Sequence, residues 1–199
     1  MRNPQRRRET RKNILEASAQ LFAERGYDAT GVAEICTRAG ISKGAFYYHF
    51  ATKQAVFVTL INEWLRELEE SLTGGRMADQ TVDEWLLSMA RSFEGILTTQ
   101  TQKTALALEF WTQARRDDAI RQAVVTPFSS FQTFFHDIIA EGIVQGDLRP
   151  IDPIAGAQVL LSLASGLFFQ GLLDPQGADW SAVAEVSISI LLEGLRRKP

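Results

Sequence analysis

Residues 14–57 read ILEASAQLFAERGYDATGVAEICTRAGISKGAFYYHFATKQAVF. In the first part of this stretch, Ile14, Leu21 and Phe22 recur at the spacing that places apolar side chains on one face of a helix. Gly26 follows, and a glycine just after the last turn readily takes the left-handed conformation that ends a helix. The pattern predicts a helix over about residues 7–24.

Two shorter helices follow in the same stretch. The second helix begins after Thr30 or Gly31 and ends at Gly40, and the third covers residues 43–50 behind Ser42, a residue type favoured at helix N-caps. Two short helices joined by a tight turn that contains glycine form a helix-turn-helix, whose second helix enters the major groove of DNA. The sequence therefore predicts a three-helix DNA-binding head.

Helical patterns continue beyond residue 53, and no alternating strand pattern occurs. Pro127 lies inside one of these patterns and is expected to kink or divide it. We expect an all-α protein of about nine helices, with a helix-turn-helix DNA-binding domain at residues 1–53 and a helical ligand-binding and dimerisation domain at residues 54–199. The further helices are expected at about residues 53–73, 81–98, 103–116, 120–145, 152–173 and 178–197.

Charge is distributed unevenly along the chain. The net charge is −3, but residues 1–53 hold ten Lys/Arg against five Asp/Glu, whereas residues 54–199 hold 11 against 19. A basic segment on an acidic remainder is typical of a protein whose basic part binds nucleic acid.

The first 55 residues contain a characteristic set of short motifs. They are Leu21-Phe22, Gly26-Tyr27, Ala29-Thr30, Ala39-Gly40, Ser42-Lys43-Gly44, Tyr47-Tyr48-His49-Phe50 and Lys53. With these motifs, the segment closely resembles the TetR family of bacterial transcriptional regulators. This resemblance implies a regulator that binds a palindromic operator as a homodimer, most often a repressor relieved by a small-molecule effector, although activators also occur among such proteins.

The resemblance also implies which residues contact DNA. Ser42 starts the recognition helix, and the small Gly44 and Ala45 let the backbone approach the groove. Gly31 stands where the family typically has a hydroxyl residue, so a side-chain phosphate contact is absent there. The residues expected to read bases are Lys43, Gly44, Ala45 and Tyr47. The residues expected to contact phosphates are Thr30, Tyr48, His49 and Lys53.

Arg6, Arg7 and Arg8 form a basic cluster before the first expected helix. Such a cluster can act as an arm that reaches an adjacent minor groove, or it can be a solvated tail. The sequence leaves both alternatives open.

Aromatic side chains cluster in the expected second domain, and in a resembling fold they surround an effector cavity. Glu109 beside Phe110 and Trp111 favours an effector that is aromatic or cationic. Plain core packing is the alternative for each aromatic residue. The expected ligand-binding residues are Trp85, Met89, Phe93, Glu109, Phe110, Trp111, Phe128 and Phe131.

The last two helices are expected to form the dimer interface over residues 152–197. Small residues such as Gly156 and Ala157 allow close approach, and Val186 and Ile190 supply an apolar stripe, so that two copies make a four-helix bundle. Residues 154–173 carry no charge and are long enough to cross a bilayer. Interrupting polar residues and flanking prolines favour a buried bundle helix, and we expect no membrane contact.

Other classes of protein fit the sequence less well. The chain has two histidines and lacks HExxH, GxSxG, a Walker loop and a GxGxxG motif after a strand, so we expect neither an enzyme nor a cofactor. The single cysteine, Cys36, is expected to pack as a small apolar residue and fits a reducing cytoplasm. A sensing or scaffold protein that has this fold but does not bind DNA remains the alternative.

Overall fold

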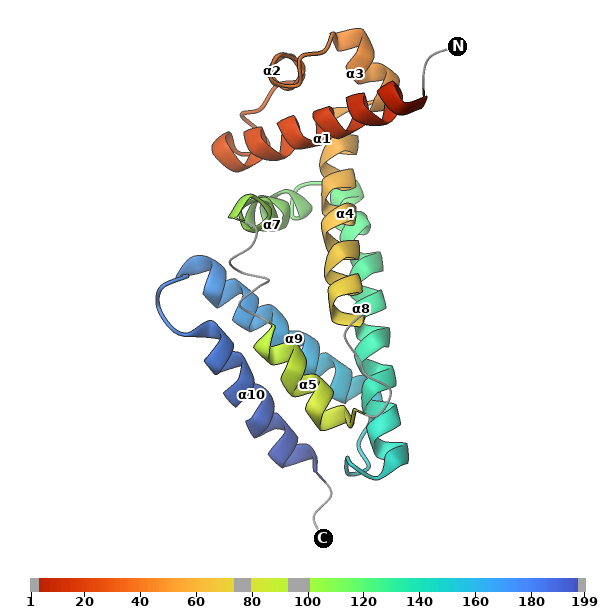
Figure 1. Ribbon diagram of the computed structural model, residues 1–199, viewed down its shortest axis with the longest axis vertical. Helices are drawn as coiled ribbons and strands as arrows, with labels where there is room; N and C mark the ends of the chain where they lie inside the picture. The colour runs from red at the N-terminus through yellow and green to blue at the C-terminus, as the bar shows by residue number, and fades with distance from the viewer. Residues whose placement is uncertain (1–3, 74–79, 93–100, 197–199) are drawn as a thin grey trace. The chain divides into compact units, whose positions relative to one another are not determined.

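The computed structural model describes residues 4–73, 80–92 and 101–196 of the 199-residue chain. Over these residues the secondary structure is α-helical, with one isolated antiparallel bridge between Leu148 and Arg196 (Figure 1). The all-α prediction is confirmed. The nine helices of the described ranges are α1 (Pro4–Arg25), α2 (Val32–Arg38), α3 (Lys43–His49), α4 (Lys53–Thr73), α5 (Val82–Arg91), α7 (Thr101–Ala114), α8 (Asp118–Gln145), α9 (Pro153–Leu173) and α10 (Trp180–Leu195).

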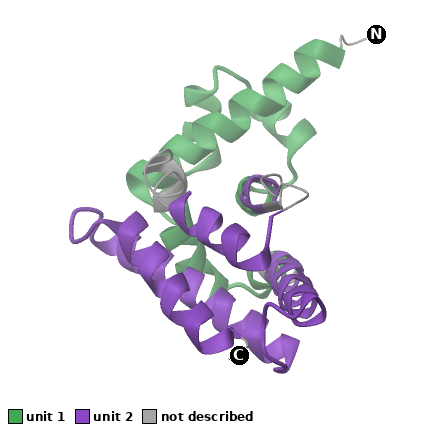
Figure 2. Ribbon diagram, turned by 60° about the horizontal axis from the view of Figure 1, so that its bottom comes forward, with its two compact units in different colours: residues 1–66, 101–125 green, residues 67–100, 126–199 purple. Residues whose placement is uncertain are grey.

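The chain forms two compact units, coloured separately in Figure 2. Unit 1 comprises residues 1–66 and 101–125, and unit 2 comprises residues 67–100 and 126–199. Helices α4 and α8 each contribute to both units. Compactness therefore groups α7 with the N-terminal helices, and a functional boundary between residues 53 and 54 stays a prediction.

Unit 1 has a core built on the apolar face of α1. Helix α1 packs against α2, α3 and α7, and Ile14, Phe22 and Phe46 are fully buried. The ring centroid of Phe22 lies 5.4 Å from those of both Tyr27 and Phe57, and the centroids of Tyr27 and Phe57 lie 4.7 Å apart. This aromatic cluster joins α1, the α1–α2 loop and α4.

The predicted helix ends in the head are confirmed. Gly26 has φ +81° and Gly40 has φ +66°, the left-handed region that favours glycine. The Ser42 hydroxyl accepts a hydrogen bond from the Ala45 N–H at 3.2 Å and so caps α3. At the start of α2, where Gly31 offers no side chain, the carboxylate of Glu34 accepts from the Gly31 N–H at 2.9 Å.

One prediction about helix limits is wrong. Helix α1 begins at Pro4, so Arg6, Arg7 and Arg8 lie in its first turns and do not form an extended arm. Proline at the start of a helix removes an N–H that has no helical partner there, which favours this earlier start. Pro127 does not divide its segment, because α8 runs unbroken from Asp118 to Gln145, and the kink that was the other expectation stays a prediction.

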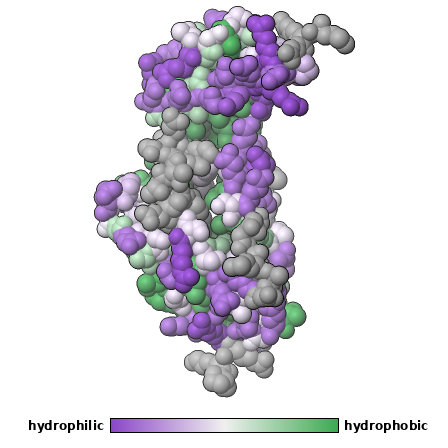
Figure 3. All heavy atoms as spheres, in the orientation of Figure 1, coloured by the Kyte–Doolittle hydropathy of each residue, from purple (hydrophilic) through white to green (hydrophobic). Residues whose placement is uncertain are grey.

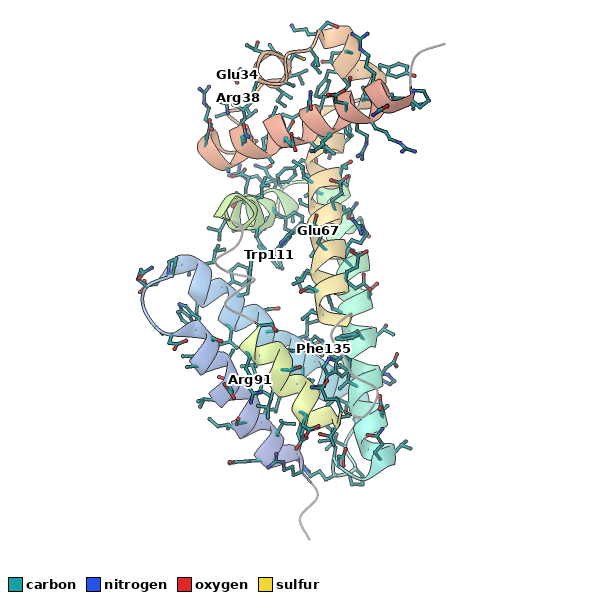
Figure 4. All side chains as sticks on the ribbon, viewed as in Figure 1. Glu34, Arg38, Glu67, Arg91, Trp111 and Phe135 are labelled. Atoms are coloured by element: carbon teal, nitrogen blue, oxygen red, sulfur yellow. The ribbon has the colours of Figure 1, made fainter. Side chains whose placement is uncertain are left out.

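Unit 2 is built around α5 and α10, which pack together. Trp85, Phe135 and Leu192 belong to its buried core, and Figure 4 labels Phe135. Two exposed ion pairs tie the two helices, one from Arg91 to Glu185 at 2.9 Å and one from Arg196 to Asp83 at 2.6 Å. The predicted segment at residues 81–98 ends as α5 at Arg91, and residues 93–98 lie outside the described residues.

The Phe22→Ala variant is expected to lower the free energy of unfolding by about 3–5 kcal/mol, because it leaves a cavity among fully buried rings. Urea unfolding at one fixed protein concentration measures this loss. The Phe22→Leu variant keeps most of the volume and is expected to lose less. A Phe22→Ala variant within about 1 kcal/mol of the parent protein would contradict the described core.

Candidate nucleic-acid interface

The rotation of α3 about its axis is set by Phe46, whose side chain is fully buried. With Phe46 facing inward, Tyr47 and Tyr48 face outward and are 55% and 53% exposed. Lys43 and Gly44 are exposed at the start of the same helix. On the face shown in Figure 3, hydrophilic residues gather over α1 to α3. The residues predicted to read bases therefore share an accessible surface, although their roles stay predictions.

Two further residues of the predicted interface lie on or beside α3. His49 is half-buried at its last turn, and its ring meets that of Tyr48 edge to face at 5.1 Å. Ala45 is half-buried and adds little side chain beside Gly44. The Ser42 hydroxyl is occupied as the N-cap of α3.

The side chain of Thr30 does not contribute to this surface. It is 1% exposed, and its hydroxyl lies 2.8 Å from the carbonyl oxygen of Gly26 and 3.3 Å from that of Leu21. The Gly26 carbonyl lies just beyond the end of α1, where carbonyl oxygens lack helical donors. The prediction that the Thr30 side chain contacts a phosphate is therefore wrong, because the hydroxyl is used inside the head.

The side chain of Lys53 is also directed inward. Its ammonium donates to the carbonyl oxygens of Tyr27 at 2.6 Å and Thr30 at 2.8 Å, and it lies 4.1 Å from the centroid of the Tyr27 ring. Burial lowers the pKa of Lys53, and the nearby charges of Asp28 and Glu109 oppose this shift. The structure thus gives Lys53 a role in holding the α1–α2 loop to α4, and its phosphate contact stays a prediction.

Glu109, on α7, points at the α1–α2 loop. One carboxylate oxygen accepts from the Gln113 amide at 2.9 Å, and the other lies 3.4 Å from the position that a Cβ on Gly26 would take. Its charge also acts on Lys53, and the attraction of a cationic effector by Glu109 stays a prediction.

The other predicted ligand-binding residues are distributed over both units. In unit 1, Phe110 is buried, whereas Trp111 is half-exposed and projects from the side of α7 away from α1 (Figure 4). In unit 2, Trp85 packs edge to face on Phe134 with centroids 5.4 Å apart, as a core residue does. A shared effector cavity stays a prediction. Of the remaining residues, Met89 packs against the unit 2 core, Phe131 is buried, Phe128 is half-buried, and Phe93 lies outside the described residues.

Ion pairs between α1 and α2 are features that the sequence did not reveal. Arg38 donates two hydrogen bonds to the Glu24 carboxylate, at 3.1 and 3.0 Å, and Arg25 pairs with Glu34 at 2.7 Å (Figure 4 labels Glu34 and Arg38). The bond from Arg38 lowers the pKa of Glu24. These partners are 9 and 14 residues apart, so only the fold brings them together.

Comparison with known protein families shows which kind of protein this chain is. Residues 14–60 match the family of bacterial regulatory proteins named for TetR, and residues 83–195 match the C-terminal part of BetI-type transcriptional repressors. The chain belongs to the TetR family. It is therefore a helix-turn-helix transcriptional regulator and not an enzyme.

Relatives and solved structures agree with this assignment. The chain is 26% identical over 178 residues to the HTH-type transcriptional regulator YfiR of Bacillus subtilis (strain 168), which covers 86% of this chain and 85% of the relative. The structure of FadR from Bacillus subtilis in complex with stearoyl-CoA has a TM-score of 0.79 at 20% identity, covering 92% of this chain and 98% of that one. A regulator from Saccharomonospora viridis in complex with choline has a TM-score of 0.80 at 20% identity, with 96% and 99% covered. At such identities the two structures support the TetR fold alone.

The Lys53→Met variant tests the internal role of the ammonium. We expect the free energy of unfolding to fall by about 1–3 kcal/mol, because two carbonyl oxygens in the α1–α2 loop lose a charged donor. Chemical unfolding measures the change. The matched control is Lys12→Met, whose ammonium is exposed 3.4 Å from Glu16 and should change stability by less than about 0.5 kcal/mol. Parent-like stability of Lys53→Met, with a weaker salt dependence of DNA binding, would contradict the internal role and favour the phosphate contact.

Proposed function

We propose that this TetR-family regulator is a cytoplasmic repressor that binds a palindromic operator as a homodimer and leaves it when a small-molecule effector binds. The observation that carries the proposal is the position of α3. Its buried Phe46 fixes the helix on the head, so that Lys43, Gly44 and Tyr47 form an exposed face suited to the major groove.

A second recognition helix is required for a palindromic site. Two recognition helices reach successive major grooves on one side of DNA when they lie about 34–36 Å apart. Since one chain holds a single helix-turn-helix in its described residues, the second helix comes from a second copy. Two-fold symmetry of the protein then matches two-fold symmetry of the operator.

The surface of α9 and α10 supports dimerisation through residues 152–197. Both helices expose large apolar side chains, and Val186 and Ile190 on α10 are 57% and 66% exposed. A patch of this kind is costly in water and is typical of an interface. Helix α9 is also long and apolar enough to cross a membrane, and a partner's α9 and α10 cover its apolar surface without a bilayer. The exposed residues on α9 are Ile154, Val159 and Leu173.

The effector proposed for this chain is aromatic or cationic. The predicted residues include Phe110 and Trp111 on α7 in unit 1, and Phe128 and Phe131 on α8 in unit 2, and aromatic rings can contact either kind of effector. Glu109 also lies on α7 and is half-buried. An effector that binds better to a DNA-incompetent arrangement shifts the population away from the operator.

The Tyr47→Ala variant tests the reading face. We expect the ratio of operator to random-DNA affinity to fall by about tenfold, within the ~1–3 kcal/mol typical of one base contact, because an exposed side chain of the reading helix is lost. Footprinting of the DNA next to the protein's own gene across a salt series identifies the operator, and titration then measures both affinities. An unchanged ratio would contradict this assignment of the reading face. If the parent protein protects no DNA, there or in a random-sequence selection, the sensing or scaffold alternative is favoured.

The Ile190→Glu variant tests the dimer interface. A carboxylate placed in an apolar interface is desolvated without a partner, so we expect the dimer to dissociate at micromolar concentration. Sedimentation velocity measures the mass. The matched control is Val144→Glu on α8, where the side chain is 87% exposed and lies outside residues 152–197. Dissociation by both variants, or by neither, would count against the proposed interface.

A further inference from the structure

We propose that a groove between the first turns of α1 and the start of α3 binds a phosphate of the DNA backbone, and that Arg7, stacked on Tyr48, is its main ligand. The groove has a volume of about 650 Å³. This site rests on the proposed function and adds to it a contact from α1. Side chains that line the groove include Arg6, Arg7, Thr10, Ser42, Tyr48 and His49.

The direction of Arg7 follows from how α1 packs. Arg7 and Arg11 are one helical turn apart, and each guanidinium lies over an aromatic ring. The Cζ atom of Arg7 is 5.5 Å from the centroid of the Tyr48 ring, and that of Arg11 is 5.4 Å from the centroid of Phe50. Arg11 also pairs with Glu63 at 3.1 Å. The buried Ile14 and Phe22 set the rotation of α1, and in this rotation Arg7 lies over Tyr48 and Arg11 over Phe50.

A guanidinium held over a ring suits the recognition of phosphate. Stacking uses the face of the planar group and leaves its N–H donors free at the edge, in the fork geometry that matches two phosphate oxygens. Arg7 loses less conformational freedom on binding than an unstacked arginine, because the Tyr48 ring already restricts it.

Charge in the groove favours an anion. Among the described residues that line it, Arg6 and Arg7 supply two positive charges and none is a carboxylate. Other cations of the same helix are used differently, since Arg11 pairs with Glu63 and Lys12 with Glu16. The positive charge that faces the groove is therefore not cancelled by an acid of its own lining.

The position of the groove selects the DNA backbone as the source of that anion. Its walls include Ser42 and Gly44 at the start of the proposed reading helix, and Tyr48 on the same helix. A strand whose bases meet α3 continues past this end of the helix. A phosphate contact there fixes the register of the head on the duplex without reading sequence. The helical start of α1 places Arg7 for this contact and replaces the minor-groove arm.

The test compares Arg7→Gln with Arg8→Gln on the footprinted operator. Arg8 is the next residue of α1, is exposed and does not line the groove, so both variants lose the same charge. For Arg7→Gln we expect about tenfold weaker binding and a salt slope smaller by about 0.9, the value for one lost phosphate contact. For Arg8→Gln we expect a clearly smaller change in both quantities. Thermal unfolding of each variant checks that the fold is retained.

A second measurement locates the phosphate directly. Single phosphates of the operator are replaced in turn by neutral methylphosphonates. We expect one replacement to weaken binding by the parent protein but not binding by Arg7→Gln. In a protein that already carries Tyr48→Leu, Arg7→Gln should weaken operator binding less than it does in the parent protein, because the stacking partner is already lost. The Arg7→Lys variant keeps the charge and should bind between the parent and Arg7→Gln, which covers the case in which Arg7→Gln fails to fold.

The possible results distinguish a failure of this site from a failure of the proposed function. A parent protein that protects operator DNA while Arg7→Gln and Arg8→Gln behave alike overturns the site and leaves the regulator standing. A parent protein that binds no DNA overturns both. Binding of inorganic phosphate to the parent protein alone, with no difference between the variants on DNA, identifies a free-anion site and overturns the backbone contact.

Discussion

The head depends on the ammonium of Lys53, which donates to two backbone carbonyls of the α1–α2 loop and lies against the Tyr27 ring. A loop that ends one helix and starts another leaves carbonyl groups without helical partners. Here the Lys53 ammonium and the Thr30 hydroxyl supply the donors, and Gly26 supplies the left-handed turn. Once this loop is fixed, α2 and α3 follow after short connections, and the exposed face of α3 is set.

The internal contacts of Lys53 change the interpretation of the positive charge in the head. Lys53, Arg11, Arg25 and Arg38 all meet an acceptor within unit 1, so much of the positive charge holds helices together rather than facing DNA. The exposed pairs among them are individually weak, at about 0–1 kcal/mol each, so they orient helices more than they stabilise them. Fewer cations than the sequence suggests are then available to attract DNA. The groove that Arg7 lines therefore contributes a larger part of that attraction.

The sequence predicted those features that depend on neighbours along the chain. Apolar spacing identified the buried face of α1, and Gly26, Gly40 and Ser42 identified the helix ends, because these signals act within a few residues. Thr30 was misassigned because its hydroxyl bonds to a carbonyl oxygen at the end of α1, which only the fold brings near. The sequence also did not reveal that Glu109 faces the α1–α2 loop, which is far from α7 along the chain. The family resemblance located Lys53 at the start of α4 but not the carbonyls beneath it.

The placement of α7 in unit 1 bears on how the binding of an effector would affect the DNA-binding helices. Arg116, just after α7, pairs with Asp28 at 3.1 Å, and the Gln54 amide donates to Asp117 at 2.6 Å. These contacts and the packing of α1 on α7 make the α1–α2 loop, the start of α4 and the α7–α8 connection one body. An effector that contacts α7 would therefore act on the α1–α2 loop through contacts inside unit 1.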